Sequence, residues 1–428
     1  MSLNIPLSKD AINNALSKLG PIIKLANEKR KDVSNILASG VPDTVNTALH
    51  YVQEIRNAIL NRQLSAEDIE ALMEKIGLNE DVNTIREFME DRKIPWIYYE
   101  MLEGVQVIKD FNETTNLDSI FQVIDQHSTS AESDRPTRLY VVGEGSSRAI
   151  PANLAVKQGL DMDNVEVLGG SCTEVEDIHE EDIVVIMSNS GETDTAIQLA
   201  DRANASGALT ISVTTNETSS LATKCEHLVH LKCGKEEAVG ATKSVVEQIL
   251  VAYEITMGKD KKPDYDQVSQ DFQSLLTQSI SPDILKQLSL ARELIIVGKQ
   301  GIHKEANLKV AETIGVPVRT IDSPDLLHGD EETFQDHNCV LIFDPDPEKV
   351  EKIEKLISSR IPVFYVTSEG LSQSIPEDRV INIEHDSPDL QPLMNLAAVQ
   401  NILVRLAIYK GSNCTPKHAR KVGDAHEG

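Results

Sequence analysis

The feature that most constrains this chain is an internal repeat of short apolar runs, each followed by residues of helical period. The run LYVVG at residues 139–143 has a counterpart in LIIVG at 294–298, which begins about 155 residues later. Apolar runs that alternate with helices are typical of a parallel sheet with helices on both faces. The repeat therefore predicts an α/β fold with two doubly wound parallel-sheet domains in tandem. The other matching pairs are 152–156 with 306–310, 183–187 with 339–343, and 211–214 with 363–366.

The repeat also suggests how the chain is divided. We expect an all-helical extension over residues 1–95, a first α/β domain over 96–260 and a second over 282–428. Residues 259–281 are interpreted as a polar join, and 127–134 as a polar loop. Residues 1–95 contain 12 Lys and Arg against 14 Asp and Glu, which argues against a basic nucleic-acid-binding face. A docking or dimerisation role for the extension is preferred.

Composition narrows the class of protein. The formal net charge of −27 argues against nucleic acid and anionic membranes as partners. The five cysteines contain no CxxC pair, which is typical of reduced thiols in a cytoplasmic protein. The first ten residues lack the features of a signal peptide, and no apolar run is long enough to cross a bilayer. We therefore expect a soluble cytoplasmic protein.

A loop rich in hydroxyl groups follows the buried run 183–187. It reads Ser188-Asn189-Ser190-Gly191-Glu192-Thr193, and a helical pattern starts directly after it. Such a loop at the carboxyl edge of a parallel sheet can bind phosphate, because the first N–H groups of a helix are unpaired. The alternative is a cluster of helix caps without a ligand. The second half has DPDPE at 344–348 in the matching place, where carboxylates would repel an anion, so only the first half is predicted to bind phosphate.

Together these motifs resemble those of the sugar isomerase (SIS) domain family. The double-domain form is closest, as in the isomerase half of glucosamine-6-phosphate synthase, and the resemblance covers roughly residues 97–428. The loop matches the family's Ser-x-Ser-Gly-Glu-Thr signature, 144–147 its first turn, and 234–243 a third loop in which Ala241 replaces a sugar-contacting Ser. The resemblance implies that the phosphosugar is bound by Ser146, Ser147, Ser188, Asn189, Ser190, Thr193, Glu236 and Val239.

The second half carries the titratable groups. Lys309 and Glu312 match a Lys-x-x-Glu pattern of the family, and His328 follows at the family's spacing. Glu312 suits a proton shuttle between adjacent carbons, and His328 an acid–base for ring opening. The resemblance implies that His328 serves the site of a neighbouring subunit, hence a homodimer. Lys309 is expected to stabilise an enolate oxygen, and Lys421 in the basic tail to form a Schiff base.

These residues predict a phosphosugar isomerase or deaminase that acts on a ketose or amino-sugar 6-phosphate of the fructose-6-phosphate or glucosamine-6-phosphate class. A fructosamine-6-phosphate deglycase and a non-catalytic sugar-phosphate sensor are the alternatives. Full synthase activity is not expected, because the resemblance places glutamine hydrolysis in a large domain that begins with a catalytic Cys, and this chain begins Met1-Ser2. No cluster has metal-ligand spacing, so neither a metal nor a cofactor is expected.

Overall fold

The computed structural model describes residues 96–130, 135–158, 165–234, 236, 238–258, 261–368 and 375–410 of the 428-residue chain. The helices predicted in 1–95 and the basic tail that contains Lys421 lie outside the described residues. No helix in the described ranges combines the length and apolarity needed to cross a membrane.

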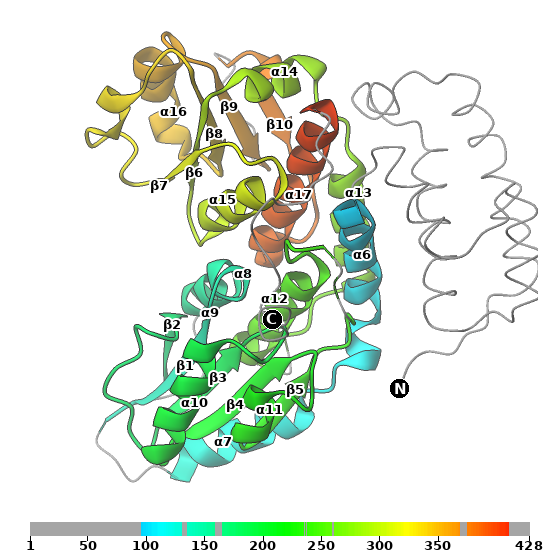
Figure 1. Cartoon of the computed structure of the whole chain (residues 1–428), viewed down its shortest axis with the longest axis vertical. Helices are drawn as coiled ribbons and strands as arrows, with labels where there is room; N and C mark the ends of the chain where they lie inside the picture. Colours follow the sequence, from blue (N-terminus) through cyan, green and yellow to red (C-terminus); the bar gives the residue numbers. More distant parts are fainter. Residues whose placement is uncertain are drawn as a thin grey trace, which may run out of the picture.

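The first α/β unit is built on a five-stranded parallel sheet in the order β2-β1-β3-β4-β5 (Figure 1). The order reverses between β1 and β3, and open α/β sheets bind their ligands at such a switch point, beyond the carboxyl ends of the strands. Its strands are β1 Thr137–Gly143, β2 Val165–Ser171, β3 Ile183–Met187, β4 Leu209–Thr214 and β5 His227–His230. Its helices are α8 Ser146–Ala149, α9 Pro151–Gln158, α10 Asp194–Ala205, α11 Ser220–Lys224 and α12 Lys243–Met257.

The second unit repeats this topology with the order β10-β9-β8-β6-β7, again all parallel. The predicted repeat of two parallel α/β sheets is therefore confirmed, and each sheet has five strands. Its strands are β6 Glu293–Gly298, β7 Val318–Asp322, β8 Asn338–Phe343, β9 Val363–Thr367 and β10 Val380–Asn382. Its helices are α14 Pro282–Leu290, α15 Ile302–Thr313, α16 Pro347–Ile353 and α17 Gln391–Lys410, with short turns at Asp330–Thr333, Glu354–Ser358, Glu377–Arg379 and Pro388–Leu390.

Both faces of each sheet are buried, which explains why the strands are continuous apolar runs. Along β3, Ile183 and Val185 face one core while Val184 and Ile186 face another. The second of these cores is closed by the small residues of α10, such as Ala200. The second sheet alternates in the same way, with α16 over one face and α15 and α17 over the other.

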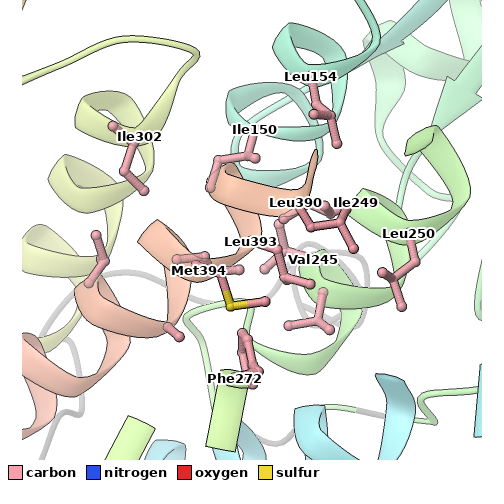
Figure 2. Close-up of a cluster of buried hydrophobic side chains, with 14 of the residues drawn as sticks. Ile150, Leu154, Val245, Ile249, Leu250, Phe272, Ile302, Leu390, Leu393 and Met394 are labelled. Atoms are coloured by element: carbon pink, nitrogen blue, oxygen red, sulfur yellow. The ribbon is translucent and has the colours of Figure 1, made fainter. Parts of the chain in front are cut away.

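A single apolar core runs between the two units and joins them (Figure 2). Ile150 and Ile249 come from the first unit, and Ile302 and Leu393 from the second. The helix α17 lies at this junction, where it packs against α13 and α15 (Figure 1). The two halves are therefore held together by burial of apolar surface, which fixes the groups that they present to each other.

Two of the local predictions are wrong. The polar join at 259–281 contains the helix α13, Tyr265–Thr277, which begins with Asp264 accepting from the N–H groups of Asp266 and Gln267 and buries Phe272. The polar loop at 127–134 is helical up to residue 130, since α7 spans Asp118–Ser130. In α13 polar side chains outnumber apolar ones, yet the apolar ones fall on one helical face. The helix α6, Trp96–Thr114, precedes α7 and packs on α12 and α13.

Candidate phosphosugar site

The hydroxyl-rich loop lies at the switch point of the first sheet, between the end of β3 and the start of α10. Gly191 has a φ of +70°, and a Cβ there would lie 2.0 Å from Ser219 Oγ. The loop is held to the end of β4 because Thr214 Oγ1 and the N–H of Thr215 donate to the carbonyl of Asn189. The loop is therefore a tightly fixed turn whose shape requires glycine.

The start of α10 bears on whether the hydroxyl-rich loop can bind phosphate or only caps the helix. Thr193 occupies the N-cap position of α10 but makes no side-chain cap hydrogen bond; its Oγ1 lies 3.0 Å from Ser188 Oγ instead. By contrast, Ser219 caps α11 and Asp346 caps α16. Within the described ranges, no side chain accepts from the N–H groups of residues 194–196. The first turn of α10 thus offers donors and hydroxyls in the arrangement that an anion requires.

We call the turn 188–193, together with the start of α10, the cradle. The loop that follows β1 lies beside it. The register places Gly143 opposite Met187, so Ser146 and Ser147 begin α8 next to the cradle. The carboxylate of Glu144 accepts from Ser171 Oγ at 2.7 Å, among other donors, and so fixes the turn. Ser146 and Ser147 therefore lie beside the cradle, and their binding of a sugar stays a prediction.

The third loop, which the structure describes at residues 234, 236 and 238–243, borders the cradle through Glu236. This carboxylate is 2% exposed and accepts from the N–H and hydroxyl groups of Thr242 and Ser244 at 2.7 to 3.1 Å. It also accepts from Asn189 Nδ2 at 3.3 Å. Glu236 thus fastens the start of α12 to the cradle, while Val239 is half-buried on the same loop.

Lys309 and Glu312 belong to the second unit but lie against the first. Lys309 Nζ lies 3.0 Å from Ser146 Oγ and 3.1 Å from Glu312 Oε2, and the lysine side chain is fully buried. A Cβ at Gly240 would lie 2.9 Å from Glu312 Oε2, so this carboxylate lies against the third loop. The two residues predicted on α15 are therefore brought to the same place as Ser146.

Glu305 completes this cluster and was missed in the sequence. Its carboxylate is fully buried and lies 3.2 Å from Lys309 Nζ, one helical turn away. Its i, i+4 spacing to Lys309 is the signal that could have found it. Burial alone would lower the pKa of Lys309, but the carboxylates of Glu305 and Glu312 outweigh it and the pKa is raised. Burial raises the pKa of Glu305, partly offset by the Lys309 ammonium. Lys309 is therefore a buried cation.

His328 and Lys421 are not part of the described cluster. His328 is exposed on the loop between β7, an edge strand, and the turn Asp330–Thr333, where its N–H donates to the carbonyl of Asp325. No side-chain hydrogen bond of His328 occurs within the described ranges. Its predicted service to a neighbouring subunit, and the role of Lys421, remain predictions.

The first α/β unit matches a known domain family, and the described fold is shared with solved structures. Residues 134–256, from before β1 to α12, match the family model for the SIS domain. The chain has the fold of the C-terminal domain of glucosamine-fructose-6-phosphate aminotransferase from Francisella tularensis, with a TM-score of 0.58, 15% identity, and coverage of 75% of this chain and 97% of that one. It has equally the fold of tagatose-6-phosphate ketose/aldose isomerase from Escherichia coli, with a TM-score of 0.60, 14% identity, and coverage of 75% and 94%.

The chain also resembles proteins of the glutamine–fructose-6-phosphate aminotransferase type. A protein of Acanthamoeba polyphaga mimivirus, named as a probable isomerizing enzyme of that type, is 26% identical over 280 residues, which is 60% of this chain and 46% of that protein. The chain spans less than half the length of the first curated relatives that it matches. The resemblance predicted from the motifs is thereby confirmed.

Proposed function

We propose that this chain is a phosphosugar enzyme that transfers a proton between C1 and C2 of a ketose or amino-sugar 6-phosphate, as isomerases and deaminases of such sugars do. The observation that carries the proposal is the junction of the two units. There Lys309, a buried cation, lies 3.0 Å from Ser146 of the phosphate-binding half, with Glu312 beside it. The names of the similar proteins, which refer to fructose 6-phosphate and tagatose 6-phosphate, support the same substrate class.

The cradle supplies the binding part of this function. The hydroxyls of Ser188, Ser190 and Thr193 and the first N–H groups of α10 would bind the phosphate, with Ser146, Ser147, Asn189, Glu236 and Val239 around the sugar. The whole chain carries a formal charge of −27, which repels a phosphate at long range. The fixed local donors must therefore outweigh this repulsion. The phosphate anchor then sets the position of C1 and C2.

The cluster on α15 supplies the chemistry. The Glu312 carboxylate, 24% exposed, would take the proton from one carbon and return it to the next. Lys309 would stabilise the negative oxygen of the enediolate that forms between these steps. Glu305 holds the lysine in place through their buried ion pair. Lys421 is proposed as the residue that forms a Schiff base with a ketose, as the resemblance implies.

Deuterium exchange tests the shared proton transfer without assuming which product forms. The chain is incubated with fructose 6-phosphate or glucosamine 6-phosphate in D₂O, and deuterium at C1 and C2 is followed by NMR while calorimetry measures binding. We expect Glu312→Gln to lower the exchange rate on the order of 10²–10⁴-fold with little change in affinity. The control is Glu351→Gln, the same change at an exposed site on α16. Binding by the wild-type chain without any exchange would instead identify a sugar-phosphate sensor.

We further propose that His328 opens the sugar ring in the site of a second copy of the chain. Its exposure, and the absence of a side-chain hydrogen bond of His328 within the described ranges, support this role. Mixing inactive His328→Ala and Glu312→Gln chains is the test, because one of the two sites in a mixed dimer would then be intact. Recovered turnover in the mixture is expected; a mixture as inactive as its parents would contradict shared sites.

A further inference from the structure

The helix α6 contacts the third loop at three points, one on each successive turn. Ile97 Cδ1 lies 3.1 Å from the position of a Cβ at Gly240, and the Glu100 carboxylate accepts from the N–H of Ala238 at 3.1 and 3.3 Å. Glu103 Oε2 lies 2.6 Å from Lys243 Nζ at the start of α12. These residues share one face of the helix, since their spacing is three residues.

All three points are shielded from solvent. Glu100 is 0% exposed, and the side chains of Lys243 and Glu103 are 7% and 10% exposed. A carboxylate and an ammonium removed from water interact strongly, and a change that removes one of them takes a buried partner from the other. The contacts are thus a defined attachment of the loop to α6, unlike a surface ion pair.

The loop in turn touches the reacting groups. Gly240 lies close to both α6 and α15, because Ile97 Cδ1, Glu312 Oε2 and Lys309 Cδ lie 3.1, 2.9 and 3.7 Å from its Cβ position. A shift of the loop therefore changes the wall against which Glu312 lies. Displacements of about 1 Å can cost on the order of 10²-fold in rate.

We propose that Glu100 and Glu103 are positioning residues, which hold residues 236–243 so that Gly240 and Val239 form the wall of the site opposite Glu312. The proposal rests on the proposed function for its kinetic consequences, but the attachment itself can be observed without turnover. Residues 188–193 are held mainly to β4, where Thr214 Oγ1 and the N–H of Thr215 donate to the carbonyl of Asn189, and they meet the loop through the 3.3 Å hydrogen bond from Asn189 to Glu236, so their affinity for phosphate is expected to change little.

The experiment compares Glu103→Gln, Lys243→Met and the double variant carrying both changes. Each single change leaves one polar partner buried, whereas the double variant removes both charges and should regain thermal stability. We expect kcat for the phosphosugar reaction to fall about tenfold or more in all three variants, with KM changed less than about threefold. Glu113→Gln, at an exposed position on the same helix, is the control.

Amide hydrogen exchange gives the readout that does not depend on activity. We expect faster exchange in residues 236–243 of all three variants and unchanged exchange in 188–193. A double variant with wild-type kcat and wild-type exchange would overturn the proposal and show that the ion pair contributes only to stability. If the wild-type chain shows no turnover, the proposed function fails, while the exchange result still decides whether α6 holds the loop.

Discussion

At the scale of single residues, the cradle depends on Gly191, where a left-handed turn and a close approach coincide. An L side chain at a φ of +70° costs roughly 1–2 kcal/mol, and a Cβ 2.0 Å from Ser219 Oγ adds an overlap. We expect Gly191→Ala to lose more stability than this φ cost alone and to weaken binding of a phosphosugar, measured by urea unfolding and calorimetry. The control is Gly315→Ala, at a φ of +61° with no atom within 4 Å. Equal losses in the two variants would show that the Ser219 contact is unimportant.

The candidate site shows which single residues a sequence can reveal. Lys309, Glu312 and the cradle follow motifs with fixed spacing along the chain, and in the structure Lys309 lies within hydrogen-bond distance of Ser146 and Glu312. Glu100 was not predicted because its partner, the N–H of Ala238, lies 138 residues away and has no sequence signature. Contacts of this kind depend on tertiary packing, so helical periodicity alone does not indicate them.

At the scale of elements, the starts of β1 and β3 are joined through Asp182. Its buried carboxylate accepts from Arg138, on β1, and from Arg135, each within 2.7 Å. Burial alone would raise the pKa of Asp182, but hydrogen bonds from Arg138 and the N–H of His179 outweigh it, and the pKa lies below 3.8. Because the folded-state pKa is depressed, the stability from this carboxylate is present above pH 3.8 and is lost as pH falls through the lower folded value.

We expect Asp182→Asn to destabilise the chain by about 3 kcal/mol near pH 7, because two arginines lose a buried partner. The difference from the wild type should shrink as the pH falls below 3.8. Urea unfolding across this range measures both effects. Asp201→Asn is the control, because its pair with Lys224 is 55% and 38% exposed and should contribute within about 0.5 kcal/mol. A constant difference at all pH values would contradict the linkage.

Strands were easier to predict than helices and edge elements. The central strands, such as β3 and β8, are continuous apolar runs because both of their faces are buried. The edge strand β7 carries Arg319 and Asp322 and lacks that pattern. The helix α13 was missed because its exposed face is polar, although Val268, Phe272 and Leu276 keep a helical period. Partial burial weakens the pattern, which is why β7 and α13 were not predicted.

At the scale of the whole molecule, one core links both units, and we expect them to unfold together. Leu393 of α17 is fully buried at the junction, so Leu393→Ala should cost about 2–5 kcal/mol. Hydrogen exchange of β3 and β8 in urea should show both midpoints moving equally. Val156→Ala, at a position 48% exposed on α9, is the control. A midpoint that moves in β8 but not in β3 would indicate two independent units.

The central claim is that the first half binds the phosphate while Glu312 of the second half meets the sugar carbons. The most direct test is a crystal structure of the Glu312→Gln variant with fructose 6-phosphate or glucosamine 6-phosphate bound. We expect the phosphate at Ser188, Ser190 and Thr193, with C1 and C2 within about 3.5 Å of the side chain at position 312. A phosphate bound away from this loop, or sugar carbons directed away from position 312, would contradict it.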